Sequence, residues 1–193
     1  MRVIAGSAGG IPLQIPRSPL RPTMDMVKGA IFSSLADAVP GARVLDLFAG
    51  SGGLGIEALS RGAASAVFVE EDWRACQCIE ENLRKTRLSG AIRKADVFHF
   101  LKPDALPWKA HLIFADPPYA KGPDLPDLAA KLVRSPHLPQ LADPEACLIL
   151  EVASGWQLPA DGHWQGARRK NYGSTDILFL HALPPASLPG PCA

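Results

Sequence analysis

The sequence predicts an α/β fold with a mostly parallel, doubly wound sheet. Short apolar runs alternate along the 193-residue chain with stretches whose apolar residues recur at helical spacing. A glycine-rich turn, Gly50–Gly55, joins the first of these buried runs to a helical stretch. Near the end, two strand-like runs surround an Asn-Tyr-Gly turn. The parallel sheet is therefore expected to end in an antiparallel hairpin.

A short β extension, residues 1–22, is expected before the main domain, which we predict to span residues 23–181. Arg2–Ala5 is strand-like and residues 11–15 alternate between apolar and polar side chains. Three prolines keep the following link extended: Pro16, Pro19 and Pro22.

The first helix is predicted to begin at Thr23, which is suited to be its N-cap, and to end at Pro40-Gly41. Asp25 is favourable in the first turn, where the helix dipole attracts negative charge. Its apolar stripe consists of Val27, Ala30, Ile31, Leu35 and Ala38.

Strands and helices then alternate. The predicted strands are Val44–Phe48, Ala66–Glu70, Ala91–Ala95, His111–Ala115 and Ala146–Val152, and the hairpin strands are Trp164–Lys170 and Thr175–Leu180. A long helix from Trp73 to about Leu88 is predicted to bury Ala75, Cys76, Ile79 and Leu83, and a shorter one spans Leu128–Arg134. Residues 182–193 contain four prolines and no charged side chain, so we expect them to be disordered.

Composition indicates a single domain without a membrane span. With 20 basic and 19 acidic residues, the net charge is close to zero and gives no indication of a nucleic-acid partner. Any basic surface must therefore be local. No apolar run has the length of a signal region or of a membrane span. The four cysteines, Cys76, Cys78, Cys147 and Cys192, lack metal-site spacing. Reduced thiols, a cytoplasmic location and no bound metal are expected.

The glycine-rich turn indicates a nucleotide-type ligand. A buried strand, the G-x-G-x-x-G spacing of Gly50–Gly55 and a following helix form the opening of a nucleotide-binding βαβ unit. The glycines let a ligand approach the backbone closely beside a helix N-terminus. Glu70, at the end of the next strand, is placed to meet ribose hydroxyls. Three glycines alone could form only a tight turn, but the flanking strand, helix and Glu70 favour the ligand.

A second motif, Asp116-Pro117-Pro118-Tyr119, follows the fourth predicted strand. In a doubly wound sheet the first and fourth strands are neighbours, so this motif should share one crevice with Gly50–Gly55. Two prolines remove two N–H donors, which leaves the Asp116 carboxylate and the Pro117 carbonyl as paired acceptors for an exocyclic amino group. Tyr119 offers a flat surface on which a base can stack. The alternative is a stiff loop in which Asp116 only caps the next turn.

These motifs together resemble the class I S-adenosylmethionine-dependent amino-methyltransferases, which have a Rossmann-like fold. The residues that carry the resemblance are Asp46-Leu-Phe-Ala-Gly-Ser-Gly52, Glu70, Asp96 and Asp116–Tyr119. From residue 1 to about 181 the chain is similar to the RsmD-type 16S rRNA guanine-N2 methyltransferases. This narrower resemblance rests on Arg2–Gly6, Leu20–Asp25 and Asn171–Gly173.

The resemblance implies S-adenosyl-L-methionine as cofactor and 16S rRNA, or a small-subunit assembly intermediate, as partner of a monomeric enzyme. The implied cofactor-binding residues are Asp46, Phe48, Gly50, Ser51 and Gly52 around the methionine part, Glu70 at the ribose, and Asp96 with Val97 at the adenine. Asp116 and Pro117 would orient the target amine while Tyr119 stacks on the base. The implied substrate-side residues are Arg21, Thr23, Asp25 and Pro118. Asp96 could equally be a helix N-cap.

Two departures from the family concern the RNA contact. The segment Gly6–Gly10 lacks the usual basic residues, and Gly29 stands where members typically carry Glu. Candidate phosphate contacts are Arg2, Arg17, Arg21, Lys28, Lys121, Arg168, Arg169 and Lys170, each of which could instead be a solvated charge.

Four alternatives remain on the sequence alone. The nearest is an adenine-N6 methyltransferase acting on DNA or RNA, which needs the same paired acceptors. Glutamine-directed relatives usually carry Asn where Asp116 stands, and a nicotinamide dehydrogenase would leave Asp116–Tyr119 without a role. A non-catalytic RNA-binding ribosome-assembly factor would need none of the site residues.

Overall fold

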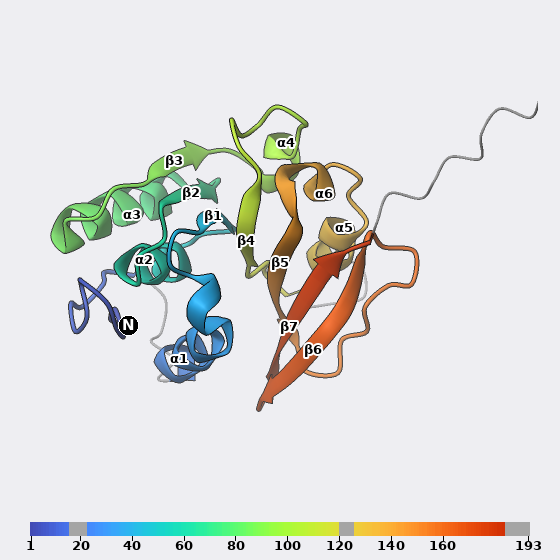
Figure 1. Ribbon diagram of the computed structural model, residues 1–193, viewed down its shortest axis with the longest axis horizontal. Coiled ribbons are helices and arrows are strands. Elements are labelled where there is room, and N and C mark those ends of the chain that lie inside the picture. Colours follow the sequence, from blue (N-terminus) through green and yellow to red (C-terminus); the bar gives the residue numbers. More distant parts are fainter. Residues whose placement is uncertain (16–22, 120–125, 184–193) are drawn as a thin grey trace, which may run out of the picture.

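The computed structural model describes residues 1–15, 23–119 and 126–183, which build one seven-stranded sheet with helices on both faces (Figure 1). The strand order is β3-β2-β1-β4-β5-β7-β6. The strands from β3 to β5 are parallel, whereas β7 runs antiparallel to both β5 and β6. This arrangement confirms the predicted fold class, and it makes β1 and β4 neighbours.

The strands are β1 (Arg43–Leu47), β2 (Ser65–Glu70), β3 (Ala91–Lys94), β4 (Ala110–Ala115), β5 (Ala142–Ala153), β6 (Trp164–Tyr172) and β7 (Thr175–Ala182). The helices are α1 (Thr23–Leu35), a 3-10 turn η1 (Ala36–Ala38), α2 (Gly53–Ser60), α3 (Trp73–Thr86), α4 (Val97–Phe100), α5 (Leu128–Val133) and α6 (Leu138–Leu141). Within the described residues, no helix is long and apolar enough to cross a membrane.

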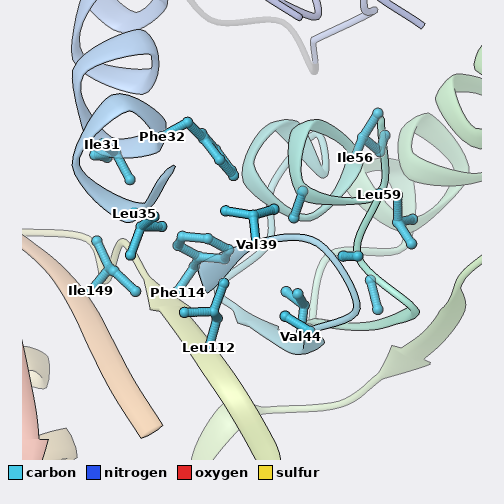
Figure 2. Packing of buried hydrophobic residues seen from close by; sticks show 14 of the residues in the cluster. Ile31, Phe32, Leu35, Val39, Val44, Ile56, Leu59, Leu112, Phe114 and Ile149 are labelled. Atoms are coloured by element: carbon cyan, nitrogen blue, oxygen red, sulfur yellow. The ribbon is translucent and has the colours of Figure 1, made fainter. Parts of the chain in front are cut away.

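Two hydrophobic clusters cover the two faces of the sheet. On one face α1, α2 and α3 pack their apolar residues over β1 and β4, and Figure 2 shows Phe32 of α1 beside Phe114 of β4. The centroids of these two rings are 5.5 Å apart. On the other face α4, α5 and α6 bury residues such as Leu132 and Leu141 against the sheet. Because both faces are covered, the central strands are apolar almost throughout.

The N-terminal extension forms a short antiparallel contact between its two predicted segments, but its described residues add no strand to the main sheet. Arg2 and Pro12 form a bridge, flanked by backbone hydrogen bonds from Val3 to Ile11 and from Leu13 to Met1. Side chains also hold the segment: the backbone N–H groups of Ile4 and Ala5 donate to the carboxylate of Glu57 in α2, at 2.7 and 3.1 Å. The Glu57 carboxylate therefore fastens the extension to α2.

Several boundaries also differ. α1 ends at Leu35, and η1 with exposed Ala38 fills the remainder, while Phe32 joins the buried stripe. In α3, Cys78 faces inward and Cys76 is only half-buried.

The second half of the sheet holds further differences. β5 begins at Ala142, directly after α6, which the sequence did not predict. The hairpin turn is Gly173-Ser174, because Tyr172 pairs with Thr175 across it. β7 extends to Ala182, and the Leu183 N–H donates to the His163 carbonyl at 2.8 Å, so the first two residues of the predicted tail are ordered. Residues 184–193 lie outside the described residues.

Candidate active site

A cavity of about 200 Å³ lies at the carboxyl ends of β1, β4 and β5. Asp46, Phe48, Gly50 and Ser51 line it from β1 and the glycine turn, and Asp116 lines it from the end of β4. The two sequence motifs, separated by some sixty residues of chain, thus face one cavity, as the strand-order argument predicted.

Met1 and α1 form part of the remaining lining, through Val27, Lys28 and Ile31, and other lining residues were not assigned to the site from the sequence. Glu151 of β5, Tyr172 of β6 and Thr175 of β7 line the side of the cavity beyond Asp116. The sequence could have indicated Glu151 as a site residue, since it is the one charged residue in the predicted strand Ala146–Val152. Tyr172 and Thr175 belong to the predicted hairpin, but the sequence did not assign them to the site; the pairing of β7 with β5 and β6 brings them to the cavity.

Asp46 holds the start of α2 against β1. Its Oδ2 accepts a hydrogen bond of 2.8 Å from the Gly55 N–H. Burial raises the pKa of the Asp46 carboxyl to about 7, and the negative charge of Glu70 adds to this, while the Gly55 N–H opposes it. A Cβ on Gly55 would lie 2.3 Å from the Phe68 ring and 3.0 Å from Asp46 Oδ2. Only glycine lets the helix approach this closely.

Glu70 links the end of β2 to the glycine turn. Its Oε2 accepts from the Gly50 N–H at 2.8 Å, and its Oε1 accepts from the Asp72 N–H at 2.9 Å. Gly50 and Gly52 both have positive φ, at 55° and 76°, which explains why glycine is needed at these positions. The carboxylate therefore fixes the shape of the turn, although Glu70 itself does not line the cavity.

Asp96 and Val97 lie at the end of β3, two strands away from Asp46. The Asp96 side chain caps α4 by accepting from the His99 N–H at 2.8 Å, which is the capping role left open by the sequence. Val97 is buried against the sheet. Neither residue lines the cavity, so their implied contact with adenine remains a prediction.

The Asp116–Tyr119 motif is partly open to solvent. Pro117 is buried, whereas Asp116 and Pro118 are exposed. The Tyr119 hydroxyl lies 3.2 Å from Thr175 Oγ1 and 3.4 Å from Glu151 Oε1. Burial raises the pKa of Tyr119 to about 12, so its hydroxyl stays protonated near neutral pH. The tyrosine ring is thereby tethered to β5 and β7.

The expected RNA-side residues near the first helix are only partly described. Arg17, Arg21 and Lys121 lie outside the described residues. Thr23 is the first residue of α1. Asp25 Oδ1 accepts from the Arg2 N–H at 3.2 Å, so Asp25 helps to hold the N-terminal segment.

Lys28 is not available as a surface phosphate contact, which corrects the prediction for this residue. It is 3% exposed, its Nζ lies 3.2 Å from Glu57 Oε2, and it donates to the Arg2 carbonyl at 2.6 Å. Burial lowers the pKa of Lys28, and the adjacent Glu57 carboxylate opposes that shift. Glu57 also accepts from Arg61 Nε at 2.7 Å. These charges hold α1, α2 and the N-terminal segment together.

The three basic residues of β6 are engaged within the fold. Arg168 donates to the Ser34 carbonyl at 3.3 Å and lies over the Phe179 ring. Arg169 pairs with Asp176 at 3.0 Å, and Lys170 donates to Ser34 Oγ at 2.7 Å. A phosphate contact from these side chains would compete with these bonds, of which those of Arg168 and Lys170 fasten the hairpin to α1.

The charges around the cavity fit a cationic ligand. Asp46, Asp116 and Glu151 bring three carboxyl groups to its lining, and Lys28, the basic residue of the lining, is already paired with Glu57. S-adenosylmethionine carries a sulfonium and an ammonium group, so its charge complements this surface. In the part of the chain that the structure describes, no three His, Cys, Asp or Glu side chains are grouped to hold a metal ion.

Comparison with known proteins places the chain in a family. The family model described as Conserved hypothetical protein 95 matches residues 1–181. YlbH of Bacillus subtilis (strain 168), a proposed rRNA methyltransferase, is 36% identical over 93% of this chain and 97% of its own length. Ribosomal RNA small subunit methyltransferase D of Escherichia coli (strain K12) is 40% identical over 63% of this chain and 62% of its own length.

Solved structures agree with the fold. The proposed methyltransferase yhhF of Escherichia coli superimposes with a TM-score of 0.76 at 30% identity, covering 94% of this chain and 97% of its own. The 16S rRNA N2 G1207 methyltransferase RsmC of T. thermophilus, solved with AdoMet and guanosine, gives a TM-score of 0.69 at 21% identity over 86% of this chain and 44% of its own. At that identity the second likeness shows the fold alone. Because the family model spans nearly the whole sequence, this chain belongs to the Conserved hypothetical protein 95 family, the RsmD family.

Proposed function

We propose that this protein is an S-adenosyl-L-methionine-dependent methyltransferase that modifies the exocyclic N2 amine of a guanine in small-subunit (16S) rRNA. The observation that carries the proposal is the shared cavity, which the glycine turn and Asp46 line together with Asp116, the first residue of the Asp116–Tyr119 motif. The relative of E. coli, named as a small-subunit rRNA methyltransferase, supports the choice of substrate.

The cofactor would be held by residues from three strand ends. Asp46, Phe48 and the Gly50–Gly52 turn would contact its methionine part, and Asp96 with Val97 would hold the adenine. Glu70 would bind the ribose hydroxyls. When bound, the cofactor supplies a methyl group on a positively charged sulfur, which is a strong electrophile without help from a metal.

The residues after β4 would prepare the nucleophile. The guanine amine is a weak nucleophile, because its lone pair is delocalised into the ring. The Asp116 carboxylate and the Pro117 carbonyl would accept its two N–H groups and turn the lone pair toward the methyl carbon. Positive charge that develops on the nitrogen is stabilised by these acceptors, and in-line positioning lowers the barrier further. Asp116 can then take up the departing proton or pass it to water.

The base must leave its stack to reach this cavity. Unstacking costs a few kcal/mol. Stacking of the base on Tyr119 would offset this cost by about 1–3 kcal/mol. We propose 16S rRNA, free or in a small-subunit assembly intermediate, as the substrate of a monomeric cytoplasmic enzyme; the names of the relatives support the RNA.

Nucleoside analysis tests this function directly. Small-subunit rRNA, free and in assembly particles, is incubated with the protein and methyl-labelled cofactor, then digested and analysed by mass spectrometry. Labelled N2-methylguanosine is expected. Labelled N6-methyladenosine would identify the adenine-directed alternative. No label, together with no saturable heat in a cofactor titration, would indicate a non-catalytic assembly factor.

A further inference from the structure

Glu151 is a charged residue of the cavity for which the proposed mechanism has no use. It lies on β5, whose residue Leu150 pairs with Ala115 of β4. Asp116 and Glu151 therefore follow a matched pair on neighbouring parallel strands, which run about 5 Å apart. Both residues line the same cavity. A base amine held at Asp116 would thus bring the adjoining edge of its ring toward Glu151.

The Glu151 side chain is held in place and acts as a hydrogen-bond acceptor. The Tyr119 hydroxyl, itself 3.2 Å from Thr175 Oγ1, donates toward Glu151 Oε1 at 3.4 Å. A carboxylate has two oxygens with about four acceptor positions, so it can accept from more than one donor at a time. The tyrosine that would stack on the base therefore also orients the glutamate beside it.

Guanine and adenine differ at the ring position that adjoins the reactive amine. Guanine carries an N1–H donor next to its N2 amine, whereas adenine has an unprotonated N1 acceptor next to its N6 amine. A carboxylate can accept from the first and repels the lone pair of the second. Enzymes that act on an extruded base commonly identify it by hydrogen bonds to this Watson–Crick edge.

Resting on the proposed function, we infer that Glu151 is a specificity-determining residue whose carboxylate accepts the N1–H of the target guanine. Asp116 and Pro117 by themselves hold an amine of either purine. Glu151 supplies the discrimination between them. A site built for a hydrogen bond discriminates strongly against an analogue that cannot form it, because the carboxylate then faces the lone pair of N1 instead of a donor.

The test uses an RNA that carries the methylation site, once mass spectrometry has mapped it, with either guanine or 2-aminopurine at that position. 2-Aminopurine keeps the N2 amine but has an unprotonated N1. Selectivity is the ratio of kcat/KM values for the two RNAs. The wild-type protein should favour guanine by about 100-fold, and Glu151→Gln should reduce this ratio by at least about 10-fold, since an amide can donate to N1.

Three further variants separate this role from a structural one. Glu145→Gln is the matched control, because Glu145 is an exposed residue of the same strand remote from the cavity, and it should keep the wild-type ratio. Glu151→Asp retains the carboxylate and should stay selective for guanine. Tyr119→Phe removes the contact between the hydroxyl and Glu151 but should leave the ratio within about 3-fold of wild type.

Three results would overturn the inference: an unchanged ratio in Glu151→Gln, no discrimination by the wild-type protein, or equal losses of selectivity in Glu151→Gln and Tyr119→Phe. The last would mean that Glu151 acts only through the tyrosine. A wild-type protein that forms no N2-methylguanosine at all would instead refute the proposed function, so the two failures are distinguishable.

Discussion

The two sides of the cavity are built in different ways. On the β1 side, Asp46, the glycine turn and the start of α2 are contiguous in sequence, buried and hydrogen-bonded to one another. On the β4 side, Asp116 follows β4, Glu151 comes from β5, and Tyr119 contacts Glu151 without lining the cavity; all three are at least partly exposed. The first side is therefore a preorganised binding surface for a ligand of fixed shape. The second side gains its geometry from tertiary contacts, as suits a group that must enter from solvent.

If the β4 side serves chemistry alone, Asp116→Ala should separate transfer from cofactor binding. We expect methyl transfer to fall by at least about 10³-fold, because in the proposed mechanism Asp116 is the acceptor that faces the developing positive charge. Cofactor affinity, measured by calorimetric titration, should stay within about 3-fold, since the β1 side is intact. Equal losses in both would show that the two sides are not independent.

Because of Asp46, the β1 side should make the stability of the folded protein depend on pH. The Asp46 carboxyl has a pKa of about 7 in the folded protein and about 4 when unfolded. Folding therefore takes up a proton between these values, and stability falls as pH rises from 4 toward 7. From about pH 5 to about pH 8 the loss should be roughly 3 kcal/mol in the free energy of urea unfolding.

Asp46→Asn is the control for that experiment, because an amide cannot ionise. Its unfolding free energy should lack this pH-dependent component. Cofactor affinity of the wild-type protein should also decline as pH falls below about 7, since a protonated Asp46 no longer attracts a cation. A pH dependence that survives in Asp46→Asn would assign it to another group.

Close packing makes the β1 side intolerant of added volume. A methyl group at Gly55 would collide with the buried Phe68 ring at 2.3 Å and approach Asp46. We expect Gly55→Ala to destabilise the protein by about 1–3 kcal/mol and to weaken cofactor binding. Gly29→Ala is the matched control, because nothing lies within 4 Å of a Cβ there and alanine favours a helix. Thermal unfolding of both variants compares them.

The smallest effect is expected for Tyr119→Phe. The ring remains for stacking, and only the hydroxyl contacts to Glu151 and Thr175 are lost. Transfer should fall by less than about 10-fold, whereas Tyr119→Ala should lose considerably more. Steady-state kinetics on the rRNA substrate measures both. Similar losses in the two variants would mean that the hydroxyl matters more than stacking.

The difference between a side built from contiguous residues and a side built from tertiary contacts also explains what could be predicted from the sequence. Strand, glycine turn, helix and Glu70 form a local pattern, so the β1 side was predicted residue by residue. Tyr172 and Thr175 belong to the predicted hairpin, but they reach the cavity because β7 also pairs with β5, and this long-range pairing leaves no local signal.

Charged residues were harder to interpret than glycines. Lys28 looked like a surface cation, yet it pairs with Glu57, a residue 29 positions away that is fully buried. Arg169 and Lys170 likewise find partners in Asp176 and Ser34. A basic side chain has the same appearance in sequence whether it meets solvent, phosphate or its own fold, and only tertiary structure distinguishes these cases.

The position of β6 at one end of the sheet has a consequence for solubility. An outermost strand exposes unpaired backbone groups that could recruit a strand from another molecule. Here the register shifts between Gly166 and Arg168, which interrupts a regular ladder, and consecutive cationic side chains follow. At the opposite end, β3 is only four residues long and carries exposed Arg93 and Lys94. Irregularity at one border and positive charge at both discourage the growth of intermolecular sheets.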